Sequence, residues 1–186
     1  MSRALDAWHR DSLNAISDQS KRNKPRATKP LSELTILIDT REQDPWKFSP
    51  MVQTERVTLS DGDYSIKGYS DQIRIERKSL ADLCGTITAG RERFKSECAR
   101  LQNYFRSWLL IEATIEDVEA ECYRSRVKGS SVLGTVLSVC CQYKVVPWFA
   151  QSHKGAAHWA EWIFRKHMQL FARSEVQELD NSLGGG

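Results

Sequence analysis

Three acidic residues lie at or beside the ends of short apolar runs that are typical of β-strands. Asp39 closes the first run, Asp63 opens the third, and Glu76 lies in the fourth. Strand ends project side chains into a shared cleft of a sheet, and carboxylate oxygens are the ligands that Mg²⁺ prefers while it keeps several waters. The pattern therefore predicts a divalent-cation site formed by these three carboxylates.

Glu76 is followed two residues later by Lys78. Side chains alternate along a strand, so this glutamate and this lysine are expected on one face, with Arg77 on the other, packing or pairing structurally. A metal ligand beside an ammonium suits phosphodiester hydrolysis, because the metal polarises the phosphate and activates water while lysine stabilises developing charge or orients that water. One strand-end aspartate alone is more commonly a turn residue or helix cap. The occurrence of Asp39, Asp63, Glu76 and Lys78 together, in this order and each at a strand, favours catalysis.

Three segments carry a resemblance to a known family. They read Ile-Asp-Thr-Arg-Glu over residues 38–42, Gly-Asp-Tyr over 62–64 and Ile-Glu-Arg-Lys-Ser-Leu-Ala-Asp over 75–82. They resemble the nuclease signature of the xeroderma-pigmentosum group F (XPF) type of structure-selective endonucleases, over roughly residues 34–167. The resemblance implies a restriction-endonuclease-like α/β fold, with a central mixed β-sheet flanked by helices, and Mg²⁺ or Mn²⁺ as cofactor. Its metal ligands and catalytic residue would be Asp39, Asp63, Glu76 and Lys78.

The same resemblance implies supporting residues. Arg41 is expected to contact phosphate, Glu42 to act as a ligand or to support one, and Asp82 to brace Lys78 or Arg77. The family also has a Gly-Arg pair that opens the next helix, and here Arg91 and Arg93 are two alternative registers for it. A helix N-terminus with arginines suits a phosphate, and the alternative is a solvated basic turn.

The remaining pattern alternates strands with helices, which predicts an α/β domain with a mixed sheet. Pro147 within the last strand predicts an edge position or a bulge, and Thr114 to Asp117 predicts a helix cap. The expected domain limits are a short helix and basic flexible arm at 1–33, the nuclease domain at 34–172 and a disordered tail at 173–186. Strands are expected at 35–39, 56–59, 63–66, 72–76, 108–112 and 144–149, and helices from 79 and at 91–108, 132–143 and 156–171.

Residues 21–30 hold five basic side chains and no acidic one. Such a segment can neutralise phosphates and release counterions, so it is a candidate DNA-binding arm; the alternative is a solvated linker. The net charge of +3 is by itself too small to indicate nucleic-acid binding. The cations assigned to DNA are Lys21, Arg22, Lys24 and Arg26, together with Arg91 and Arg93.

The amino-acid composition narrows the classes of protein to which the chain can belong. Hydrophobic residues make up 40% and charged residues 27% of the 186 residues, as in soluble globular proteins. No apolar run approaches the ~20 residues that span a bilayer, and the N-terminus lacks a secretory pattern. The expected location is cytoplasmic for a bacterial or phage-like stand-alone protein, or nuclear for a eukaryotic one. The five cysteines include no Cys-x-x-Cys pair, which argues against a zinc site, and the histidines have no metal-type spacing.

The functional hypothesis is a DNA endonuclease that cuts branched, flap or junction DNA in repair or recombination. Cellular members of the resembled family usually append a tandem helix-hairpin-helix module, and no segment after 171 could encode one, so branch selectivity and a heteromeric partner stay open. A homodimer is expected, because residues 132–171 carry much aromatic surface: Trp148, Phe149, Trp159 and Trp162. The alternatives are a non-catalytic DNA-binding partner with the nuclease fold and a nuclease acting on RNA.

Overall fold

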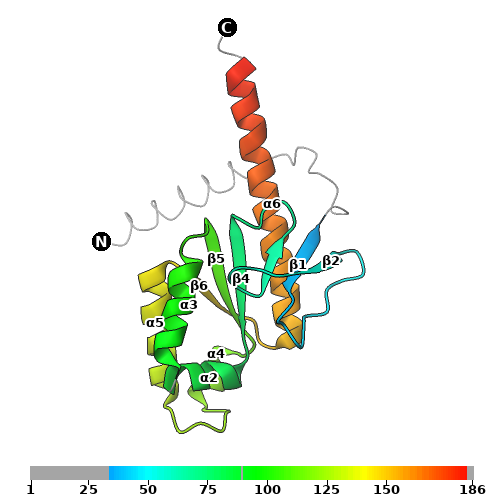
Figure 1. The fold of residues 1–186 in the computed structure, drawn as a ribbon. Helices are drawn as coiled ribbons and strands as arrows, with labels where there is room; N and C mark the ends of the chain where they lie inside the picture. Colours follow the sequence, from blue (N-terminus) through cyan, green and yellow to red (C-terminus); the bar gives the residue numbers. More distant parts are fainter. Residues whose placement is uncertain (1–33, 89, 184–186) are drawn as a thin grey trace, which may run out of the picture.

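A computed structural model of the chain describes residues 34–88 and 90–183, with side chains of the last helix described as far as 171. Within them, one sheet of six strands lies between helices (Figure 1). The predicted short helix and basic arm, at 1–33, lie outside the described residues. The strands are β1 (Thr35–Asp39), β2 (Gln53–Val57), β3 (Tyr64–Ile66), β4 (Ile73–Lys78), β5 (Arg106–Ile111) and β6 (Val146–Phe149).

The strand order across the sheet is β2-β1-β3-β4-β5-β6. The β1–β2, β4–β5 and β5–β6 pairs are parallel, whereas β3 runs antiparallel to both β1 and β4. The prediction of an α/β fold with a central mixed sheet flanked by helices is confirmed. The predicted edge position of the Pro147 strand is also confirmed, because β6 is the last strand of the sheet, where a missing N–H is tolerated.

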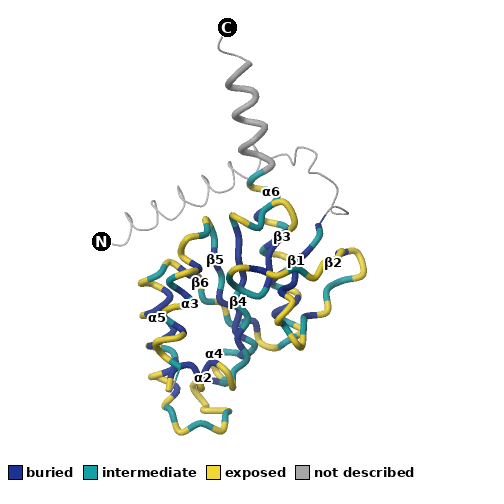
Figure 2. Tube along the Cα trace, viewed as in Figure 1, coloured by how far each residue is buried: buried dark blue, intermediate teal, exposed yellow. Residues whose placement is uncertain are grey.

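The helices form one layer on each face of the sheet, and burial is concentrated between these layers (Figure 2). Residue alternation along β5 explains this: Leu110 packs with the α6 side, and its neighbours Leu109 and Ile111 pack with α2, α3 and α5. On the α6 side the core includes Ala160 and Phe164. The helices are α2 (Leu80–Thr88), α3 (Arg91–Leu101), α4 (Ile115–Glu119), α5 (Gly129–Tyr143) and α6 (His153–Leu183).

Several predicted boundaries were wrong. The helix expected over 91–108 ends at Leu101, because Trp108 is needed in β5, where it pairs with Ile75 and Val146. The strand expected at 56–59 lies instead at Gln53–Val57, an exposed edge strand whose sequence lacks an apolar pattern.

The last helix also runs past residue 172, where the nuclease domain was expected to end. Helix α6 continues from there to Leu183, so most of the segment expected to be a disordered tail is helical. The cap expected at Thr114 is confirmed, with Asp117 as its reciprocal partner. No helix in the described part of the chain combines the length and the apolar character that crossing a membrane requires.

Candidate active site

The C-terminal end of β4 carries the predicted catalytic pair. Glu76 and Lys78 lie on the face covered by α3, with the Lys78 ammonium 3.1 Å from Glu76 Oε1. Arg77 points to the other face, where it binds Glu112. The predicted alternation of these three side chains is confirmed, as the period of two along a strand requires.

Asp63 reaches the same place through the turn before β3. Gly62 has a φ of +68°, and a Cβ there would lie 3.2 Å from the carbonyl oxygen of Ile75, so glycine allows this close approach. Asp63 N donates to the Ile75 carbonyl at 2.9 Å, and Asp63 Oδ2 accepts from Arg77 N at 2.7 Å. These two bonds lock Asp63 beside β4, next to Glu76.

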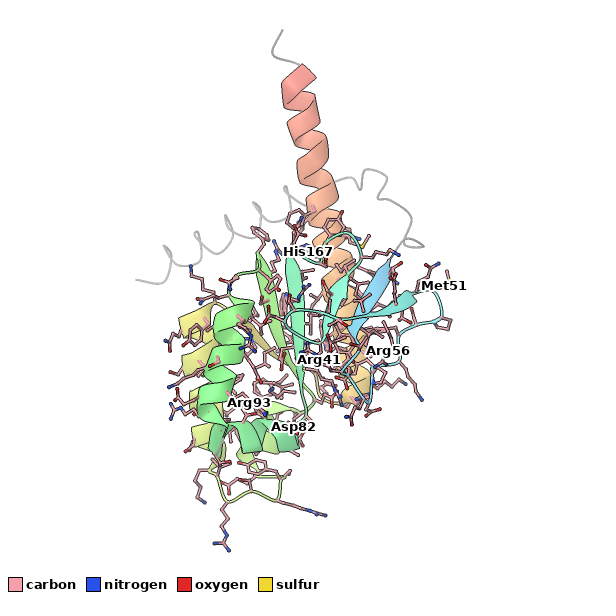
Figure 3. The ribbon with its side chains drawn as sticks, viewed as in Figure 1. Arg41, Met51, Arg56, Asp82, Arg93 and His167 are labelled. Carbon is pink, nitrogen blue, oxygen red and sulfur yellow. The ribbon has the colours of Figure 1, made fainter. Side chains whose placement is uncertain are left out.

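The side chains face one open pocket with a volume of about 840 Å³. Its walls come from the β1–β2 connection, the start of β3, the end of β4 and helices α2 and α3, so segments far apart in the sequence meet there. Figure 3 labels Arg41, Asp82 and Arg93, which lie around it on three different elements. The charged lining residues are Arg41, Glu42, Asp63, Glu76, Arg77, Lys78, Asp82, Arg93 and Glu97.

The two central carboxylates are crowded. Burial, and after it the charge of Glu76, raise the pKa of Asp63 to about 7. Burial also raises the pKa of Glu76. An opposite charge nearby favours the ionised form of such groups, so a bound cation would relieve this crowding.

The donor set of the pocket fits a hard cation. Mg²⁺ commonly takes one or two protein carboxylates and completes its shell with water and phosphate oxygens, and Mn²⁺ accepts the same ligands. Between residues 34 and 183, with 89 set aside, no three His, Cys, Asp or Glu side chains already stand in the arrangement of a metal centre. Asp63 and Glu76, which face the pocket together, could hold the ion with water completing its shell.

Glu97 is a pocket residue that the sequence reasoning missed. Its Oε2 accepts from Lys78 Nζ at 3.1 Å, so the ammonium is shared between Glu76 and Glu97. Burial lowers the pKa of Lys78, but the two carboxylates raise it by more, and the side chain stays charged. The sequence signal for Glu97 is weak, because a glutamate in an amphipathic helix usually faces solvent.

Asp39 does not line the pocket, although the sequence predicted it to be a metal ligand. Its side chain is 2% exposed. Its carboxylate accepts from Arg41 N at 2.8 Å, Arg41 Nε at 2.6 Å, Arg41 Nη2 at 3.1 Å and Leu59 N at 2.7 Å. Burial raises its pKa, but these bonds lower it by more, and the net change is downward. The structure therefore gives Asp39 the role of holding the β1–β2 connection.

Glu42, three residues after Asp39, lines the pocket, whereas Asp39 does not. Its Oε1 accepts from Arg77 Nη1 at 3.0 Å, and its charge contributes to the raised pKa of Asp63. Arg77 is held in turn by Glu112, which also accepts from Trp46 Nε1 at 2.6 Å. The predicted structural pairing of Arg77 is confirmed, and Glu42 stands where a further carboxylate ligand could act.

His153, at the start of α6, joins this network. Its Nδ1 lies 2.9 Å from Glu112 Oε1 and 3.3 Å from Arg77 Nη2. His153 was assigned no role from the sequence, because the histidines have no metal-type spacing relative to the acids. Its partners in the structure lie 41 and 76 residues away along the chain.

The remaining predicted residues are divided between roles. Asp82 does not brace Lys78 or Arg77 as expected; it accepts from Ser79 Oγ at 2.7 Å, and its N donates back at 3.1 Å, so the pair caps α2. Of the two alternative arginines, Arg93 lines the pocket. Lys21, Arg22, Lys24 and Arg26, together with the rest of the arm, lie outside the described residues.

Comparisons with known proteins agree with this fold. The chain resembles the structure of XPF from Aeropyrum pernix with a TM-score of 0.57 and 24% identity, over 78% of this chain and 69% of that one. It resembles the same protein in complex with DNA with a TM-score of 0.58 and 24% identity, over 72% and 64%. Comparison with curated proteins gives no match. The family model of the ERCC4 domain matches residues 38–161, which include all three motif segments and every residue that lines the pocket, and the chain therefore belongs to the ERCC4 domain family.

Proposed function

We propose that this protein is an Mg²⁺- or Mn²⁺-dependent DNA endonuclease that hydrolyses phosphodiester bonds. The observation that carries the proposal is the placement of Asp63 and Glu76 side by side, with the Lys78 ammonium, in one polar pocket. Membership of the ERCC4 domain family supports the same activity.

Each residue has a proposed task. Asp63 and Glu76 hold the cation, with Glu42 as a further carboxylate at the pocket wall. When bound, the metal would polarise the phosphate and lower the pKa of a water. Lys78 remains an ammonium and stabilises the charge that develops on the phosphate oxygens. Arg77, fixed by Glu112, positions the backbone N–H that binds Asp63.

DNA is the proposed substrate, and branched, flap or junction DNA in repair or recombination is the proposed class. The DNA complex of the Aeropyrum pernix XPF supports DNA over RNA. Arg41 and Arg93, with side chains 66% and 76% exposed at the pocket, are proposed to contact phosphates of the bound DNA. Arg91 and the basic segment 21–30 are proposed to add backbone contacts.

A homodimer is the proposed assembly. The aromatic cluster on β6 and α6 supports it: Trp148 is 36% and Trp162 is 51% exposed, and both carry rings that contact neighbours on the same surface. Large exposed aromatic side chains at a sheet edge are typical of an interface.

The decisive experiment is a cleavage panel with purified protein. Flap, splayed-arm, four-way-junction and linear duplex DNA, each with a matched RNA version, are incubated with Mg²⁺, with Mn²⁺ and with EDTA. Metal-dependent cutting of branched DNA is expected. Binding of DNA without cutting under every metal condition would identify a non-catalytic partner instead, and preferential cutting of the RNA versions would identify an RNA nuclease.

A further inference from the structure

Glu97 is a charged side chain of the pocket to which the proposed chemistry gives no task. It lies in the middle of α3 with its side chain 18% exposed. One carboxylate oxygen accepts from Lys78 Nζ at 3.1 Å, and the other lies 3.3 Å from Arg93 Nε, one turn earlier in the helix. Helix α3 does not need this contact to pack, because Phe94, Cys98 and Leu101 fill the core beneath it.

The Lys78 ammonium therefore has two carboxylate partners at the same distance, Glu76 Oε1 and Glu97 Oε2, both 3.1 Å away. Glu76 is also a proposed cation ligand, so the cation and the ammonium compete for one carboxylate. Two positive charges on the same carboxylate repel each other, and in a buried site the repulsion is larger than in water. A second carboxylate bound to Lys78 offsets this repulsion, because it holds the ammonium when the cation takes Glu76.

We infer that Glu97 is a positioning residue for Lys78: it retains the ammonium in the pocket when the cation takes Glu76. This inference rests on the function proposed above and adds a residue to it. Without the Glu97 charge, Glu76 would be the one carboxylate left in an ion pair with Lys78 among the residues that the structure describes. Cation binding would then require breaking that ion pair, and the released ammonium would no longer be held where charge develops.

Cation binding without DNA provides the first test. Mg²⁺ and Mn²⁺ are titrated while the unfolding temperature is followed, since a ligand that binds the folded state raises it. Glu97→Gln should raise the cation concentration for half-maximal stabilisation by roughly tenfold, the size found when support of a metal ligand is lost. Lys78→Met should lower that concentration, because it frees Glu76 from its competitor.

The double variant separates positioning from direct ligation. With Lys78→Met already in place, Glu97→Gln should have little further effect on cation affinity, because the competitor is absent. At saturating cation and DNA, Glu97→Gln should lower kcat by about tenfold or more with little change in KM. It should lower kcat no further once Lys78 is replaced.

Glu92→Gln is the matched control. It removes the same charge from the same helix, but Glu92 is exposed, pairs with Lys95 and lies outside the pocket, so wild-type affinity and rate are expected. If Glu97→Gln fails to fold, Glu97→Ala, which also removes the charge, carries the same comparisons.

The outcomes distinguish the inference from the function. Equal losses from Glu97→Gln with and without Lys78 would overturn the inference and make Glu97 a direct ligand of the cation. A variant indistinguishable from Glu92→Gln would also overturn it. In both cases, cleavage of DNA by the wild-type protein would still support the proposed function. A wild-type protein that binds no cation and cuts no DNA would contradict both the proposed function and this inference.

Discussion

The Arg41 side chain binds both carboxylate oxygens of Asp39, from Nε at 2.6 Å and from Nη2 at 3.1 Å. The Asp39 carboxylate also accepts the backbone N–H groups of Arg41 and Leu59. A carboxylate with this many short bonds is stabilised in its ionised form, and releasing it to a cation would leave those donors unpaired. These bonds fix the path of the chain after β1, and this accounts for an aspartate at position 39 of the first motif.

Asp39→Asn should therefore reduce stability more than cation binding. We expect a loss of about 1–3 kcal/mol in the free energy of unfolding, because a buried charged acceptor is removed from its donors. Urea unfolding measures the loss, and the cation-induced rise in unfolding temperature measures affinity. A large loss of cation affinity in a variant of near wild-type stability would return Asp39 to the set of metal ligands.

Asp63→Asn and Glu76→Gln should abolish cleavage while leaving DNA affinity largely intact. Each removes a cation ligand, and with it several kcal/mol of transition-state charge stabilisation, whereas the basic side chains that bind phosphate remain. Rates are measured at saturating DNA, and binding by anisotropy. Asp71→Asn, an exposed site outside the pocket, is the control. Cleavage by the Asp63→Asn/Glu76→Gln double variant at the wild-type rate would refute the assignment.

Cation affinity should rise with pH through neutrality. The pKa of Asp63 is about 7, raised by burial and then by Glu76, and a carboxylate must be ionised to bind a metal. Titration of Mg²⁺ at about pH 6 and at about pH 8 should give weaker binding at the lower value. Affinity that does not change over this range would place the cation away from Asp63.

The same pKa predicts that the stability of the metal-free protein falls, whereas cation affinity rises, as the pH increases through neutrality. The unfolded chain releases the Asp63 proton near pH ~4 and the folded chain near 7, so the folded state binds more protons between these values. The stability associated with protonated Asp63 is complete below pH ~4 and is lost as the pH rises through about 7. Asp63→Asn should flatten this decline in urea-unfolding measurements, whereas Asp71→Asn should keep it.

The aromatic surface of α6 and β6 should form a dimer interface. Trp162→Ser removes a 51% exposed side chain, so it should cost little stability but shift the protein toward monomer in light scattering. Leu137→Ser is the control, because Leu137 is 57% exposed on α5, in the other helix layer. A fully active wild-type monomer at high concentration would contradict a dimer.

The basic segment should affect DNA affinity and leave the chemistry unchanged. Replacing Lys21, Arg22, Lys24 and Arg26 by Gln should flatten the plot of log K against log salt by up to about 3 to 4 units, since each phosphate contact contributes roughly 0.9. The rate at saturating DNA should stay near wild type. An unchanged slope would make the segment a linker.

Local patterns of the sequence were enough to predict the sheet and part of the candidate site. The two-residue spacing of Glu76 and Lys78 placed both on one face because side-chain alternation is a property of any strand. Gly62 before Asp63 marked a turn for the same local reason, and Pro147 marked an edge strand. Helix ends were less accurate, as at Leu101, because strand pairing of Trp108 with Ile75 overrides the helical pattern.

The sequence by itself determined which residue types were candidates for the site: carboxylates at strand ends with one lysine, in the order of the XPF-type signature that the chain resembles. The tertiary structure alone decided which acids share the pocket. Asp39 is withdrawn by bonds to Arg41 and Leu59, and Glu97 is added by the docking of α3 beside β4. The physical reason is that a carboxylate binds whichever donors lie nearest in space: Leu59 is 20 residues from Asp39 along the chain, and Glu97 is 19 residues from Lys78.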